Sequence, residues 1–123
     1  MLFRSNVISM GNGSGTDFTG TITQSYNMSS DGSAAGTGSL INKTAANQFV
    51  SLTGGSENFH LKAGADAINT GTDLSASGVT TDIDGDTRPI STGWEIGADE
   101  TTASATGVRQ PRPSGSGQYP AIY

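Results

Sequence analysis

Three stretches in the second half of the chain decide the fold: NFHLKAGADAINTG (58–71), TDIDGDTRP (81–89) and WEIGADE (94–100). The first opens with Phe59 and Leu61 alternating with polar neighbours, and Ala67 and Ile68 follow. Side chains of a strand alternate between its faces, so the pattern predicts that these apolar side chains point into a core. We therefore expect the segment to begin with a short strand that faces a core.

The other two stretches predict a turn held against a last strand. Asp84-Gly85 is typical of a tight turn, and Pro89 favours an extended backbone at Arg88. A guanidinium projecting from that position can bind a carboxylate through two nitrogens. We expect Arg88 to form an ion pair with one of the acids that follow. This ion pair, or clamp, would hold a last strand at 94–98 against the turn. The candidate acids are Glu95, Asp99 and Glu100.

In this order the three stretches resemble the closing segment of bacterial right-handed parallel β-helix repeat proteins, including surface proteins with interchangeable C-terminal anchors. The family pattern runs aspartate-phenylalanine-x-leucine, glycine-serine-proline-alanine-isoleucine-aspartate-x-glycine, aspartate-x-aspartate-glycine-x-x-arginine-proline, then aspartate-isoleucine-glycine-alanine-x-glutamate. The resemblance covers about a third of the chain. The sequence departs from the pattern at Ala65, Asp66, Asn69 and Glu95.

The resemblance implies an all-β fold: the last coils of a right-handed parallel β-helix (a β-solenoid), followed by a capping segment at 57–100. Such a cap covers the apolar face and unpaired edge that the end of a solenoid presents to water. Residues 1–56 would form the terminal coils. Residues 101–123 have the Ser-, Gly- and Pro-rich composition of a flexible linker, so we expect disorder there.

The composition agrees with short strands and tight turns. Leu, Ile, Val and Phe make up only about a sixth of the chain, whereas Gly alone accounts for 18 of 123 residues. A thin core predicts that the coils depend on neighbouring upstream coils for burial. The chain has no cysteine, which excludes disulfides and thiol chemistry. The net charge of −5 argues against nucleic acid as a partner, and no apolar run is long enough to span a membrane.

Apolar stretches with strand-like alternation recur at intervals of roughly 20 residues, at 6–10, 19–27 and 48–52. This spacing predicts solenoid coils, with the Gly-rich run 11–15 as a corner loop. Residues 1–5 have two interpretations: a sequence scar from a translated adapter, or an ordinary start in which Leu2 and Phe3 pack.

Asp82, Asp84 and Asp86 alternate like the oxygen ligands of a calcium loop. The main interpretation is instead a turn with Asx hydrogen bonds and a salt bridge to Arg88, because the later positions of a calcium loop are not matched. Calcium remains the alternative, and otherwise no cofactor is expected. Asp82, Asp84 and Arg88 also resemble the calcium-binding acids and the basic residue of a polysaccharide lyase site. Such sites lie on the middle coils of a β-helix, so we expect no catalytic residue in this chain.

Three further side chains are candidates for binding or catalysis. His60, the only histidine, is expected at a solvent-facing strand position and not as a catalytic base. Trp94 and Tyr26 could stack on a sugar, although a lone tryptophan more often packs in a core or cap.

The predicted function is the non-catalytic structural end of a secreted or cell-surface β-helix protein that serves adhesion or polysaccharide binding, with upstream coils of the same protein as its partner. Two alternatives remain open. The chain could be the inert end of a β-helix polysaccharide lyase or glycoside hydrolase, or part of a phage tail-spike-like fibre.

Overall fold

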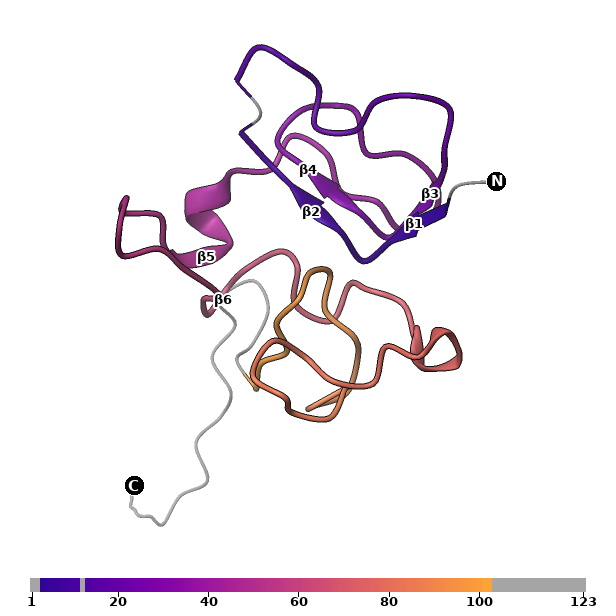
Figure 1. The fold of residues 1–123 in the computed structure, drawn as a ribbon, viewed down its shortest axis with the longest axis vertical. Helices are drawn as coiled ribbons and strands as arrows, with labels where there is room; N and C mark the ends of the chain where they lie inside the picture. Colours follow the sequence, from indigo (N-terminus) through magenta and orange to yellow (C-terminus); the bar gives the residue numbers. More distant parts are fainter. Residues whose placement is uncertain (1–2, 12, 103–123) are drawn as a thin grey trace.

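The computed structural model describes residues 3–11 and 13–102 (Figure 1). Short strands, turns and two 3₁₀ turns, η1 (Ala45–Asn47) and η2 (Ser75–Ser77), make up this part of the chain. The coarse expectation of a non-helical protein with small strands is therefore confirmed. The tail predicted from residue 101 lies almost entirely outside the described residues, as do Met1 and Leu2. No helix in 3–11 or 13–102 is long and apolar enough to cross a membrane.

Four short strands between Phe3 and Ser29 form two parallel pairs with one constant offset. β1 (Phe3–Ser5) pairs with β3 (Thr23–Ser25), and β2 (Ile8–Ser9) pairs with β4 (Met28–Ser29). In both pairs the partner lies 20 residues further along the chain. Met28 also forms a parallel bridge to Leu40, which adds a third layer.

A single residue with a left-handed backbone turns the chain between the strands of each layer. Asn6 has φ 57° and Tyr26 has φ 52°, and the two corners are joined by a hydrogen bond from Asn6 N to Tyr26 O (2.9 Å). Asparagine tolerates this conformation because its short polar side chain bonds locally. Asn27 directly follows the second corner and is fully buried; its side chain accepts from Val7 N (3.0 Å) and donates to Arg4 O (3.1 Å). The polar corner thus fixes how the two layers stack.

The third apolar stretch forms a hairpin and not a third coil. β5 (Phe49–Ser51) pairs antiparallel with β6 (Asn58–Leu61). The intervening turn contains Gly54-Gly55, with φ 82° at Gly55 and a hydrogen bond from Ser56 N to Thr53 O (2.8 Å). Two adjacent glycines favour such a chain reversal. The boundary predicted between residues 56 and 57 falls inside this hairpin.

Residues 65–100 form a compact set of turns that lies against the first strand layer (Figure 1). Gly97 N donates to Asn6 O (2.9 Å), whereas Asn6 N donates to Tyr26 O in the second layer. The Asn6 side chain accepts from Thr72 N (2.9 Å) and donates to Thr72 O (2.7 Å). This contact joins residues 66 positions apart in sequence and places the 57–100 segment on the Asn6 edge of the strand layers.

The last strand expected at 94–98 does not form. Gly71 N bonds to Trp94 O and Ile96 N bonds to Ala67 O, but no continuous ladder develops. The guanidinium of Arg88 takes Glu95 O and Gly97 O as acceptors, so these carbonyl groups point to a side chain instead of a neighbouring strand.

The core is small and lies between the strand layers and the 57–100 segment. Six buried residues form it, and Ile8, Met10, Leu40 and Phe49 pack around them; the six are Met28, Leu61, Ala65, Ala67, Ile68 and Ile96. The inward position expected for Leu61 is confirmed, whereas that for Phe59 is wrong. Phe59 is 55% exposed and packs edge-to-face on the half-buried Phe49 of the hairpin, with ring centroids 5.3 Å apart, instead of entering the core.

Candidate functional site

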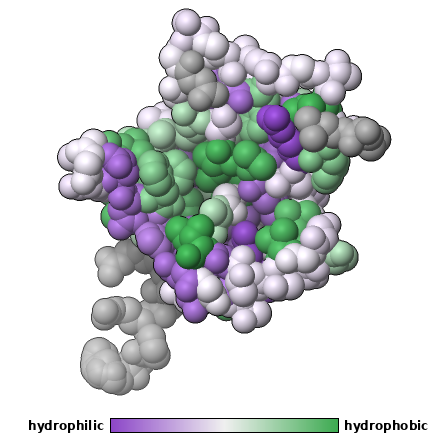
Figure 2. All heavy atoms as spheres, in the orientation of Figure 1, coloured by the Kyte–Doolittle hydropathy of each residue, from purple (hydrophilic) through white to green (hydrophobic). Residues whose placement is uncertain are grey.

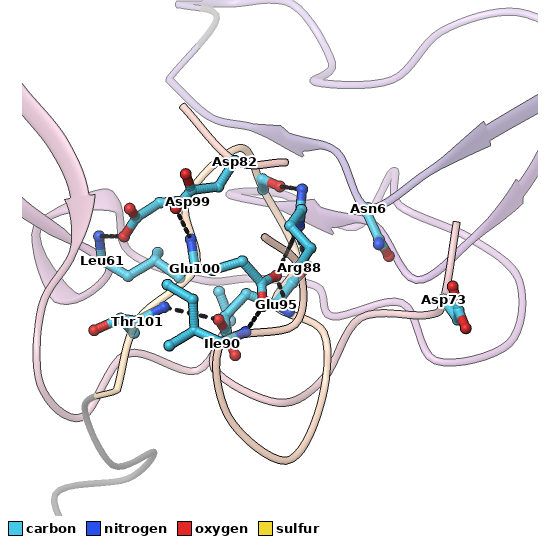
Figure 3. A network of polar contacts seen from close by, with 12 residues as sticks. Asn6, Leu61, Asp73, Asp82, Arg88, Ile90, Glu95, Asp99, Glu100 and Thr101 are labelled. Atoms are coloured by element: carbon cyan, nitrogen blue, oxygen red, sulfur yellow. Dashed lines mark hydrogen bonds and ion pairs between the residues drawn. The ribbon is translucent and has the colours of Figure 1, made fainter. Parts of the chain in front are cut away.

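Arg88 lies at the centre of a buried polar network (Figure 3). Its Nη2 is 2.6 Å from Glu100 Oε1, and its Nε donates to the same oxygen at 2.9 Å. Nη1 donates to Gly97 O (3.2 Å) and Nη2 to Glu95 O (3.1 Å). Of the three acids considered from the sequence, Glu100 is therefore the one whose carboxylate contacts Arg88.

Trp94 covers this ion pair. The guanidinium carbon of Arg88 lies 4.8 Å from the Trp94 ring centroid, a geometry that favours a cation over an aromatic face. Trp94 is only 7% exposed, so its ring has no open face for a sugar. Tyr26, the other aromatic considered for stacking, is half-buried at its corner, with Gly38 packed against its ring.

Buried carboxylates connect the 57–100 segment by accepting backbone N–H groups from distant residues. Glu95 accepts from Asn69 N (Oε1, 3.0 Å) and Thr101 N (Oε2, 3.0 Å). Asp99 Oδ2 accepts from Leu61 N at 2.7 Å, and thereby ties the end of the segment to β6. Acceptors of this kind replace the hydrophobic contacts that the thin core cannot supply.

Burial changes the proton affinity of these groups. Desolvation raises the pKa of Glu95 to about 7, and the nearby Glu100 carboxylate adds to the effect. Burial also raises the pKa of Asp99, opposed by the hydrogen bond from Leu61 N. Arg88 compensates the negative charge of Glu100. Glu95 has no such cation beside its carboxylate among the described residues, so burial favours its protonated form.

The Asp-Gly turn has the Asx hydrogen bonds of the main sequence interpretation but not its salt bridge to Arg88, which among the described residues pairs with Glu100. Asp82 Oδ1 accepts from Asp84 N and Asp86 N, each at 2.9 Å, and Oδ2 accepts from Glu100 N at 3.2 Å. Burial opposes ionisation of Asp82, but these N–H groups outweigh it and lower its pKa. Gly85 has φ 90°, which accommodates the turn. Because both oxygens of Asp82 face N–H groups, the calcium alternative at this loop stays a prediction that gains no support from its geometry.

A second cluster brings His60 of β6 close to the same turn. His60 Nε2 lies 3.0 and 3.2 Å from the two carboxylate oxygens of Asp84, and this hydrogen bond raises the pKa of His60. His60, Asp84 and Asp99 each offer one ligand atom, and these atoms all lie within 4.8 Å of one another. The sequence did not suggest this group, because its members are 15 to 39 residues apart.

An apolar cavity of about 780 Å³ lies between the strand layers and the 57–100 segment. Figure 2 shows hydrophobic side chains gathered around this hollow. Val7, Ile8, Phe49 and Leu52 line it from the strand layers and hairpin, and Phe59, Ile83 and Ala98 complete it. These last three directly precede His60, Asp84 and Asp99 in sequence, but the cluster residues themselves do not line the cavity.

No protein-family model, curated protein or solved structure matches this chain.

Proposed function

We propose that the chain is a structural, non-catalytic unit of a secreted or cell-surface parallel β-helix protein, in which residues 57–100 cap a short stack of coils. The constant 20-residue offset of both parallel strand pairs supports this proposal. Short parallel strands that stack with one corner residue above another are the building unit of a β-solenoid, and the bridge from Met28 to Leu40 adds a further layer after a shorter coil.

The observation that carries the proposal is the contact between the 57–100 segment and the Asn6 edge. An unpaired strand edge is a template for association with another chain, and proteins commonly cover such edges. Here Gly97 N donates a hydrogen bond to Asn6 O. The Asn6 side chain donates to Thr72 O and accepts from Thr72 N. A segment in this position would prevent the stack from pairing edge to edge.

The position of the cap also bears on the proposed partner. A solenoid adds each coil beside the preceding one, so upstream coils would stack next to residues 3–9, at the Asn6 edge. Upstream coils and the 57–100 segment therefore compete for the same edge. We propose that the segment covers it whenever further coils are not stacked there.

A Gly71→Ala substitution tests the capping role. A Cβ at Gly71 would lie 2.4 Å from Glu95 O and 3.0 Å from Asn6 Oδ1, whereas a Cβ at Gly32 would meet no atom within 4 Å. We expect Gly71→Ala to displace the segment and produce oligomers by size-exclusion chromatography with light scattering, while Gly32→Ala stays like the parent chain. A Gly71→Ala protein that remains folded and no more associated than the parent would overturn the capping role.

Adhesion or polysaccharide binding by the flank of the coils is part of the same proposal and is supported by the resemblance of the three closing stretches. Electrophoresis through gels that contain neutral or acidic polysaccharides tests it. Retardation that is reduced by Tyr26→Ala supports sugar binding at the corner of the second layer. Equal mobility in all gels contradicts it.

A further inference from the structure

We propose that His60, Asp84 and Asp99 form a binding site for a divalent transition metal ion such as zinc. The three side chains come from three separate elements: β6, the Asp-Gly turn and the end of the 57–100 segment. One imidazole and two carboxylates match the ligand types that zinc takes in proteins. The imidazole distinguishes this site from an oxygen-only calcium loop.

The hydrogen bonds of His60 determine which ring nitrogen faces the site. Asn58 Oδ1 accepts the backbone N–H of His60 at 3.0 Å, and the same oxygen lies 2.5 Å from His60 Nδ1. An amide oxygen carries no hydrogen and can only accept, so Nδ1 must carry the proton. In a neutral ring the lone pair is then on Nε2, the atom that faces Asp84. Metal-binding histidines are commonly oriented in this way by an acceptor on the other nitrogen.

The Nε2 lone pair and the Asp84 carboxylate are both acceptors, and they lie only 3.0 Å apart. Two acceptors at this distance need positive charge between them, either the proton of the His60–Asp84 ion pair or a bound cation. Metal bonds of about 2.1 Å place neighbouring ligand atoms roughly 3.0–3.4 Å apart, so a cation fits between these two groups with small movements. A divalent cation would neutralise both carboxylates, whereas a proton on His60 would leave one negative charge in excess.

Asp99 provides the independent argument for a ligand. It is only 4% exposed, and one of its oxygens accepts from Leu61 N. Among the contacts of the described residues, no hydrogen bond or ion pair engages its other oxygen. Burial disfavours the ionised form of such a carboxylate, and a cation held between its unused oxygen and the other potential ligands would strongly stabilise that form. The exposed Asp84 and the half-buried His60 leave the remaining coordination positions open to water.

Zinc titration of the full chain, prepared without a histidine tag, tests the site. His60 is the only histidine, so its ring signals in NMR report binding without ambiguity. We expect saturation at one zinc per chain, with the His60 ring signals shifted. Cobalt(II) in place of zinc should give the visible absorption of a nitrogen- and oxygen-ligated ion.

Three variants should weaken zinc binding roughly tenfold or more: His60→Gln, Asp84→Asn and Asp99→Asn. Asp99→Asn keeps an oxygen for Leu61 N, so it separates loss of the ligand from loss of the fold. Asp86→Asn is the matched control, because Asp86 lies in the same turn but outside the cluster, and it should bind zinc like the parent chain. Unshifted His60 signals at stoichiometric zinc, or equal weakening by Asp86→Asn, would overturn the proposal.

Discussion

Arg88 and Glu100 form a buried ion pair, with Nη2 and Oε1 2.6 Å apart and side-chain exposures of 4% and 0%. Both partners are also hydrogen-bonded to the backbone: Arg88 to the carbonyl groups of Glu95 and Gly97, and Glu100 to Glu95 N at 3.0 Å. A buried ion pair costs the folded protein little free energy only when the remaining donors and acceptors of both side chains are hydrogen-bonded in this way.

Replacing Arg88 by Ala should lower the free energy of unfolding by about 3–5 kcal/mol, because the substitution leaves Glu100 buried without a cation. Urea denaturation followed by the fluorescence of Trp94, the only tryptophan, measures the loss. The double variant Arg88→Ala/Glu100→Gln should recover part of it. An unchanged midpoint for Arg88→Ala would contradict the clamp.

Stability should increase by roughly 1–3 kcal/mol as the pH falls from 8 to about 5. The pKa of Glu95 is raised to about 7 in the folded protein, so the folded state binds the proton more tightly than the unfolded chain and gains from protonation in this window. Below about pH 4 the trend should reverse, because the lowered pKa of Asp82 means that its protonation favours unfolding.

Glu95→Gln provides the control for this pH dependence. It should remove most of the slope between pH 5 and 8 and leave the smaller slope of His60, whose raised pKa acts in the same direction. Thermal unfolding at several pH values measures both proteins. A full slope in Glu95→Gln would assign the effect to another group.

Asp82→Ala should destabilise the protein by about 2 kcal/mol, because it leaves the N–H groups of Asp84, Asp86 and Glu100 without their acceptor. Asp86→Ala, at an exposed position of the same turn, should change stability by less than about 0.5 kcal/mol. Chemical denaturation compares the two, and equal losses would show that Asp82 has no special role.

Calcium titration by calorimetry should give a flat trace at millimolar concentrations. Both carboxylate oxygens of Asp82 already accept backbone N–H groups, so a calcium ion would have to replace three hydrogen bonds. A binding isotherm that Asp82→Asn abolishes would instead support the calcium alternative for Asp82, Asp84 and Asp86.

Asn6→Gly should lower the free energy of unfolding by about 1–2 kcal/mol. Glycine keeps the left-handed backbone of the corner but loses both hydrogen bonds to Thr72. Asn47→Ala, at an exposed asparagine, is the control and should be nearly neutral. A neutral Asn6→Gly would show that the side chain does not hold the 57–100 segment in place.

The sequence by itself determined the local features of this protein. Glycine content and strand-like alternation predicted short strands and turns, and Asp84-Gly85 predicted a tight turn that the structure contains, because such preferences depend on backbone conformation within a few residues. The spacing of Arg88 and its following acids also restricted the choice of ion-pair partner to three residues.

Only the tertiary structure decided which of these acids met Arg88, where residues 57–100 lie, and that His60 meets Asp84 and Asp99. Alternation at 48–52 fitted a coil as well as a hairpin, and only the pairing partner separated the two. Phe59 and Leu61 have equivalent patterns, yet one is exposed and the other buried. Contacts between residues far apart in the chain depend on which backbone groups and charges must be satisfied together on burial, and no local pattern records that requirement.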